Sequence, residues 1–175
     1  MKRPSLSLLL SLAALPSIAA MNEPSGISDK LRPAVDEQVA FVMKAEGVQI
    51  YACKPSPKDP YAYAWAFVAP EATLAEGGNV VGRHYGGPTW ESSSDRSSVK
   101  GAVRERQDGG AGNIPWLLLT GSSTSTSGKF ANITSVQRLA TQGGVEPAEP
   151  CRELNAGKEV RVPYTADYYF YKRRG

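Results

Sequence analysis

The chain has 175 residues, of which 41% are hydrophobic and 21% charged, with 20 Lys or Arg against 17 Asp or Glu. A single histidine and two cysteines exclude a multi-histidine metal site and leave zinc only two thiolates, so we expect no metal and no cofactor. Without Lys2 and Arg3 at the N-terminus, 18 basic residues face 17 acidic ones, a balance that argues against nucleic-acid binding.

The first 20 residues have the pattern of a secretory signal peptide. Two basic residues precede an apolar run from Leu6 to Leu15, and small residues follow, with cleavage expected after Ala19 or Ala20. The run is too short to span a bilayer, and no later stretch is long enough to do so. The sequence thus predicts a secreted or periplasmic protein with a signal peptide (1–20), a flexible N-terminal segment (21–33) and a single β domain (34–175).

The first part of the domain shows the alternation of β-strands, interrupted by turn residues. We favour a strand from Val39 onward, a break at Gly47 and a second strand from Val48 to Cys53. A proline-rich loop follows, and the segment from Pro70 to Asn79 is expected to be a connector.

The clearest alternation places four aromatic side chains on one face of a strand: Tyr61, Tyr63, Trp65 and Phe67. Four exposed rings on one strand would form a larger apolar patch than a soluble monomer usually carries, so we expect this face to point inward. A surface on which sugar rings stack is the alternative.

The stretch from Val80 to Glu91 predicts a strand, a tight turn and a second strand. It holds the only histidine, His84, together with Tyr85 and Trp90. Turns on a rigid sheet commonly carry binding groups. His84 either contacts a ligand or donates a hydrogen bond to a carbonyl across the turn, and in a hairpin its imidazole is expected to face Glu91.

Further strands are predicted in four later segments, namely Val99 to Val103, Ile114 to Leu119, Ile133 to Leu139 and Tyr164 to Tyr171. The second of them is continuously apolar, so both of its faces should be covered. Eight or nine short strands without a long helical period predict an all-β fold, either an antiparallel sandwich or a barrel.

Cys53 and Cys151 are the only cysteines of the chain. In an oxidising compartment an even number favours a disulfide, here one that closes a long loop. Two unrelated buried thiols are the alternative.

No catalytic motif is evident, and we assign no catalytic residue. A Ser-His-Asp arrangement could join His84 to Asp95 or Asp167, but no spacing selects a nucleophile. The glycine run at 109–112 follows charged residues and leads into Pro115, so it lacks the context of a dinucleotide-binding loop.

Six segments carry a resemblance to known sequences: Gly47–Cys53, His84–Glu91, Ile114–Leu118, Gln137–Gly144, Cys151 and Pro163–Phe170. On these segments the chain resembles an uncharacterised family of secreted bacterial and fungal proteins, classified as a domain of unknown function. Fungal members often carry a malate dehydrogenase label, which we reject because the dinucleotide fingerprint is missing. The resemblance implies the disulfide and the site location, and it implies glycine where this chain has Arg96.

The leading hypothesis is a non-enzymatic binding domain for a small molecule, a glycan or an envelope component. Its candidate binding residues are His84, Tyr85, Trp90, Glu91 and Arg138. The alternatives are a small extracellular hydrolase centred on His84 and a structural envelope protein. The hydrolase requires a Ser, Asp or Glu within hydrogen-bond reach of His84, whereas a binding domain requires an aromatic-lined cavity. A structural protein requires no cavity.

Overall fold

The computed structural model describes residues 26–59 and 61–175. The predicted signal peptide lies outside these residues. In chain order the elements are η1 (Asp29–Leu31), β1 (Glu37–Pro55), β2 (Tyr63–Glu76), β3 (Asn79–Tyr85), β4 (Thr89–Ser92), β5 (Ser98–Gln107), β6 (Trp116–Ser123), β7 (Ser135–Gly143), η2 (Glu153–Asn155) and β8 (Glu159–Arg173). The η elements are single 3-10 turns, and the part of the chain that is described contains no α-helix.

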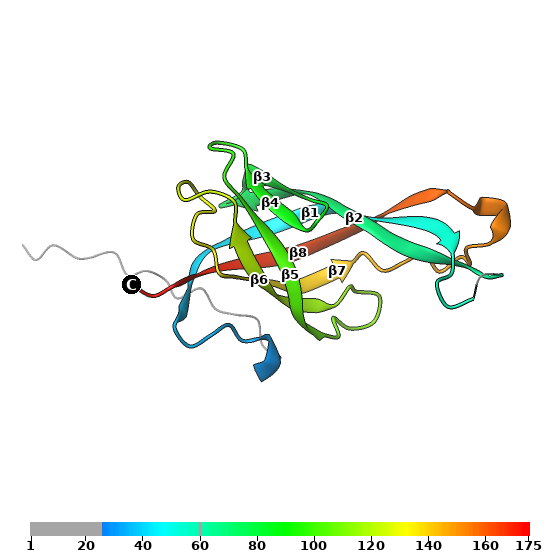
Figure 1. Cartoon of the computed structure of the whole chain (residues 1–175), viewed down its shortest axis with the longest axis horizontal. Helices are drawn as coiled ribbons and strands as arrows, with labels where there is room; N and C mark the ends of the chain where they lie inside the picture. The colour runs from blue at the N-terminus through cyan, green and yellow to red at the C-terminus, as the bar shows by residue number, and fades with distance from the viewer. Residues whose placement is uncertain (1–25, 60) are drawn as a thin grey trace, which may run out of the picture.

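The eight strands form one antiparallel sheet whose spatial order follows the chain. β8 pairs with β7 on one side and with β1 on the other, so the sheet closes into a barrel (Figure 1). The predicted all-β antiparallel fold is confirmed, and of its two forms the barrel is the one that occurs. Closure leaves every strand paired on both sides over part of its length, which removes the free edges of an open sheet.

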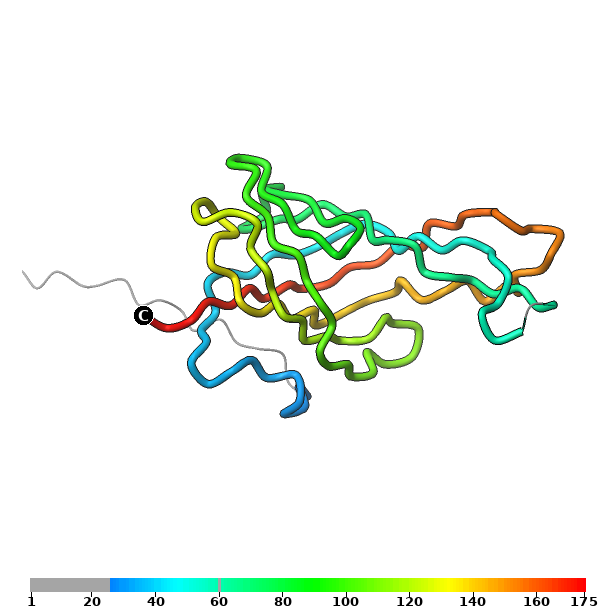
Figure 2. Tube along the Cα trace, in the orientation of Figure 1, coloured from blue at the N-terminus to red at the C-terminus, as the bar shows by residue number. Residues whose placement is uncertain are grey.

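Three strands continue past the barrel and form a projecting arm. The arm consists of residues 48–55 of β1, 63–69 of β2 and 159–163 of β8, which pair with one another but with no other described strand. Figures 1 and 2 show these segments extending together, in cyan, teal and orange, to one side of the remaining strands. Only one sheet is present in the arm, so its faces have no second sheet to pack against.

The expected break at Gly47 is wrong, because β1 runs through it. The segment expected to be a connector from Pro70 to Asn79 is strand as far as Glu76, and only Gly77 and Gly78 form a turn. A Cβ on Gly47 would lie 2.1 Å from Glu71 O and 2.4 Å from Ala72 Cα, so glycine here allows close approach of the two strands. Pro70 pairs with Gln49 beside a bulge between Ile50 and Tyr51. A proline at a bulge interrupts the ladder locally without ending the strand.

The aromatic face of β2 does not point into the core, contrary to the expectation from its alternation. Tyr61 precedes the strand and is 94% exposed, and Phe67 is 55% exposed, while Tyr63 and Trp65 are half-buried. This half of β2 belongs to the arm, where no second sheet of the described chain packs against its aromatic face. Trp65 instead donates from its indole nitrogen to Glu149 O at 2.7 Å.

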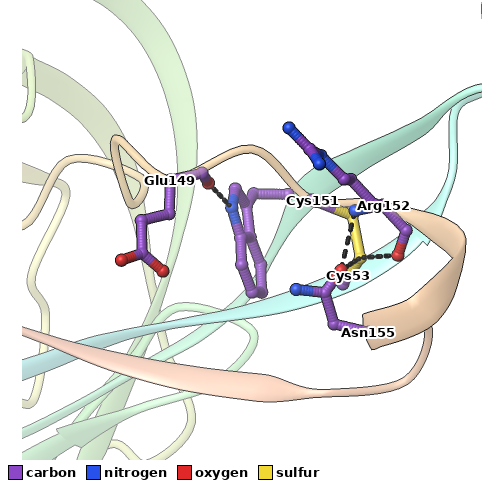
Figure 3. Close-up of a disulfide and its surroundings, with 6 residues drawn as sticks. Cys53, Glu149, Cys151, Arg152 and Asn155 are labelled. Atoms are coloured by element: carbon purple, nitrogen blue, oxygen red, sulfur yellow. Dashed lines mark hydrogen bonds between the residues drawn. A yellow bond between two sulfur atoms is a disulfide. The ribbon is translucent and has the colours of Figure 1, made fainter.

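The predicted disulfide between Cys53 and Cys151 is confirmed, with the two Cα atoms 5.5 Å apart. Figure 3 shows Cys53 on β1 and Cys151 in the loop that leads to η2. In the same loop Arg152 N donates to the Asn155 side chain at 2.8 Å. The disulfide thus fastens the segment between β7 and β8 to the arm.

Apolar side chains fill the barrel and also cover part of its outer wall. Inside, the rings of Phe41, Phe130 and Phe170 pack together with centroids 4.8 to 5.5 Å apart. Outside, Leu118 and other apolar residues of β6 to β8 pack against Leu31 from the N-terminal segment. This cover explains why β6 is apolar on both faces, as its sequence indicated.

Candidate functional site

In the hairpin formed by β3 and β4, some candidate residues point into the barrel and others point out of it. Its register pairs Arg83 with Glu91 and His84 with Trp90. Because successive side chains of a strand point to opposite faces, His84 and Trp90 point inward while Tyr85 and Glu91 point outward. The prediction that the His84 imidazole faces the Glu91 carboxylate is therefore wrong.

His84 is buried, with 3% of its surface exposed, and makes the hydrogen bond across the turn that its position suggested. Its Nδ1 lies 2.8 Å from Thr89 O, and because a carbonyl only accepts, Nδ1 carries the proton. The ring stacks on Trp90 with centroids 4.5 Å apart and meets Tyr168 edge-on at 5.1 Å. Burial lowers the pKa of His84 to about 3, so the imidazole is neutral at physiological pH and Nε2 is an acceptor.

Tyr85 and Glu91 belong to a polar network on the outside of the barrel. Tyr85 Oη donates to the Glu91 carboxylate at 2.7 Å, and Arg83 and Arg96 contact it at 3.2 and 3.0 Å. The hydrogen bond from Tyr85, aided by the two arginines, lowers the pKa of Glu91, and the same bond raises the pKa of Tyr85. These contacts join Tyr85 and Glu91 to each other and to the arginines.

A cavity of about 340 Å³ lies where the arm leaves the barrel. Its wall comes from all eight strands, together with the β3–β4 turn and the segment before β6. Most of the wall is apolar, and its large side chains include Tyr51, Phe67, Trp90, Leu117 and Leu119. The structure thus brings His84, Trp90 and Arg138 together around one cavity, whereas Tyr85 and Glu91 are not part of its wall.

Arg138 is half-buried in the cavity wall, on the same inward face of β7 as the buried Val136. Its Nε and Nη2 donate to Pro115 O at 3.1 and 2.8 Å. Pro115 is in the segment that leads into β6, so this pair of bonds connects β7 to the cavity rim. Arg138 forms no ion pair with any Asp or Glu in residues 26–59 and 61–175.

Four buried polar atoms lie at or beside the cavity without a well-formed hydrogen bond to any described residue: Gln49 Nε2, Trp90 Nε1, Tyr164 Oη and Tyr168 Oη. Gln49, Trp90 and Tyr168 are part of the wall. Burial raises the pKa values of Tyr164 and Tyr168. The two hydroxyls also lie close enough to each other to affect these pKa values, as do Gln49 beside Tyr164 and Arg138 beside Tyr168. Buried polar groups are normally paired, so such a cluster distinguishes this cavity from an ordinary packing defect.

Sequence reasoning missed Gln49, Tyr168 and the exposed Arg106 at the rim. The alternation of β1 suggested that Val48 and Ile50 face the core, yet Gln49 is the side chain that is 2% exposed. A polar residue on an inward face is a local conflict of the kind found at functional sites. This conflict can be recognised in the sequence only when it is already known which face of β1 points inward.

Fold and cavity together define the class of protein: a closed antiparallel β-barrel domain with a small, mostly apolar cavity at the base of an arm. The family model described as "Protein of unknown function (DUF3455)" matches residues 75–172. The chain therefore belongs to this family, which confirms the resemblance to an uncharacterised family. No curated protein and no solved structure matches the chain.

Two further observations concern metals and membranes. No group of three or more His, Cys, Asp or Glu side chains suited to a metal ion occurs in the portion of the chain that is described. Within that same portion, no helix is long and apolar enough to cross a membrane.

Proposed function

We propose that this protein is exported and binds a small molecule in the cavity at the base of the arm. The observation that carries the proposal is a cluster of buried polar side chains in an otherwise apolar cavity wall, among them Trp90, whose indole N–H has no hydrogen-bond partner among the described residues. Small-molecule sites typically combine such a wall with a few placed polar groups. Export is supported by the signal-peptide pattern of residues 1–20 and by the disulfide, which is typical of oxidising compartments.

The geometry gives less support to a hydrolase centred on His84. Among the residues described, His84 hydrogen-bonds to Thr89 O and to no Ser, Asp or Glu. A histidine with a pKa of about 3 is also a weak general base at neutral pH. The cavity itself argues against a purely structural envelope protein.

Native mass spectrometry of the protein purified from its own host tests this proposal. We expect a co-purifying small molecule that is released on unfolding. Val103→Trp should abolish the complex, because Val103 lies in the cavity wall and a larger side chain would fill the mouth.

Val80→Trp is the matched control, since Val80 is exposed and outside the wall. This variant should retain the bound molecule. Host-purified protein that carries no small molecule, or a Val103→Trp variant that binds as well as the control, would contradict the proposal.

A further inference from the structure

The polar groups of the cavity wall are mainly hydrogen-bond donors. Trp90 Nε1 can only donate, and Gln49 Nε2 has a second N–H beyond the one directed at Tyr164. Tyr168 Oη, which accepts from Tyr164 and Arg138, keeps its own proton to donate. Gln49, Trp90 and Tyr168 are 1 to 2% exposed and line the cavity, so water at the surface does not satisfy them. A ligand that meets them must therefore present acceptor atoms.

The charge of the wall is positive. Arg106 and Arg138 line the cavity, and no Asp or Glu does. Arg138 donates from Nε and Nη2 to Pro115 O, and its guanidinium also lies close enough to Tyr168 Oη to offset part of the rise that burial causes in the pKa of that tyrosine. A guanidinium in an apolar wall favours an anion, and its planar array of N–H groups matches a carboxylate.

Two neighbouring groups could weaken this preference, but neither opposes it strongly. The charge of Glu146 reaches Tyr51, which lies in the wall, but Glu146 is exposed and its charge is screened by solvent. His84 Nε2 is an acceptor on a neutral ring and carries no negative charge.

The size and the apolar wall restrict the rest of the ligand. A volume of about 340 Å³ lies at the lower end of the usual range for ligand sites, roughly 300 to 1,000 Å³. Phe67, Leu117 and Leu119 provide contacts for an apolar body but no partners for further charges.

We infer that the cavity binds a compact organic acid, with its carboxylate on Arg138 and the neighbouring donors and its apolar body against the aromatic and aliphatic wall. This inference rests on the proposed function, because it specifies the ligand of the same cavity. It goes further in assigning Arg138, Gln49, Trp90 and Tyr168 as the groups that select the carboxylate.

Isothermal titration calorimetry with matched probes tests the inference on the purified, disulfide-bonded protein. Cinnamate, cinnamyl alcohol and cinnamylammonium share one body and differ in the polar end, and octanoate, octanol and octylammonium repeat the comparison with a flexible body. We expect each acid to bind at least about tenfold more tightly than its alcohol, a difference of about 1.4 kcal/mol, and each ammonium ion to bind least.

Two substitutions assign the carboxylate to its partners. Arg138→Gln should weaken binding of the acid about tenfold and leave binding of the alcohol nearly unchanged, while Arg138→Lys should restore part of the loss. Tyr168→Phe removes one hydroxyl, which lies near Tyr164 and Arg138, and keeps the buried ring, so the variant should fold and still weaken acid binding.

Arg104→Gln is the control for net charge, because Arg104 is exposed on β5 and outside the cavity wall. It should bind every probe as the wild type does.

The outcomes separate the two proposals. Equal affinity for acid and alcohol would overturn the inference about the carboxylate and leave small-molecule binding intact. A co-purifying host molecule without an acidic group would likewise overturn the inference about the carboxylate and leave small-molecule binding intact. If no probe binds and no host molecule co-purifies, both proposals fail.

Discussion

His84 is neutral because its surroundings disfavour the charged form. It is 3% exposed, its pKa is lowered to about 3 by burial, and its ring stacks on Trp90 and meets Tyr168 edge-on. In the unfolded chain the same imidazole has an ordinary pKa of about 6.5. Between these two values the unfolded chain binds a proton that the folded protein does not bind.

The free energy of unfolding should therefore fall as the pH drops below about 6.5. The carboxylates whose pKa values are lowered, such as Glu91, become protonated mainly below their ordinary value. Burial raises the pKa of Asp167, so its protonation favours the folded state and acts against the effect of His84, and a His84 variant is needed to assign the loss. We expect a loss of about 1 to 2 kcal/mol between about pH 7 and pH 5, measured by urea unfolding at each pH. His84→Gln should show a flatter dependence, and an equally steep one would mean that another group titrates.

Arg96 has a backbone conformation that side chains seldom adopt. Its φ of 61° is left-handed, in the loop where Asp95 accepts hydrogen bonds from Ser97 at 2.6 and 3.0 Å. The family resemblance implied glycine here, and the conformation explains that preference. The ion pair with Glu91 at 3.0 Å offsets part of the strain.

Replacing Arg96 by Gly and by Ala separates these two effects. Both variants lose the ion pair between the exposed Arg96 and Glu91 equally, so this loss cancels in the comparison. Only Arg96→Gly relieves the backbone, so it should be more stable than Arg96→Ala by about 1 kcal/mol. Urea unfolding of the two variants measures the difference, and equal stabilities would show that the left-handed conformation carries no strain.

At the scale of elements, a tryptophan inside the barrel contributes more to the free energy of unfolding than a tryptophan on the arm. Trp90 is 1% exposed in the barrel interior, whereas Trp65 is half-buried on the arm and packs beside the disulfide loop. Trp90→Ala should lower the free energy of unfolding by about 3 to 5 kcal/mol. Trp65→Ala should lower it by less than half as much, because little of its surface is removed from water by the core.

Thermal and urea unfolding of both variants in parallel checks this comparison. A Trp65→Ala variant as unstable as Trp90→Ala would mean that the arm is part of the cooperative core.

The strand alternations predicted the class of fold but not the lengths of the strands. Gly47 and Pro70 are turn residues in most contexts, and here one allows close strand approach and the other sits at a bulge. Local sequence does not distinguish these uses, because the distinction depends on which strands are neighbours. His84, Trp90 and Arg138 could be named as candidate residues from the sequence. Gln49 and Tyr168 could be assigned to the cavity wall only once the register of the strands was known.

At the scale of the molecule, the N-terminal segment packs against part of the apolar outer wall of the barrel and stabilises it. Leu31 in η1 is fully buried against β6 to β8, and its carbonyl accepts a hydrogen bond from Gln137 Nε2 at 2.6 Å. The N-terminal segment expected to be flexible thus contributes a packed residue to the structure.

Leu31→Ala should therefore lower the free energy of unfolding by about 2 to 4 kcal/mol. Leu154→Ala is the matched control, because Leu154 is 100% exposed, and it should change the stability by less than about 0.5 kcal/mol. Urea unfolding measures both. A Leu31→Ala variant as stable as the control would show that this segment is dispensable.

The pairing of the first strand with the last has a consequence for how the chain folds. Glu37 on β1 lies opposite Arg173 on β8, near the end of the sequence. Until β8 emerges from the ribosome, β1 and β7 each lack a neighbour, and the sheet cannot close. Contacts so distant in sequence form slowly and late. Such a chain acquires its final structure only after β8 has been synthesised, and this delay is compatible with the export that we propose, because an export channel of the general secretory type admits unfolded chains.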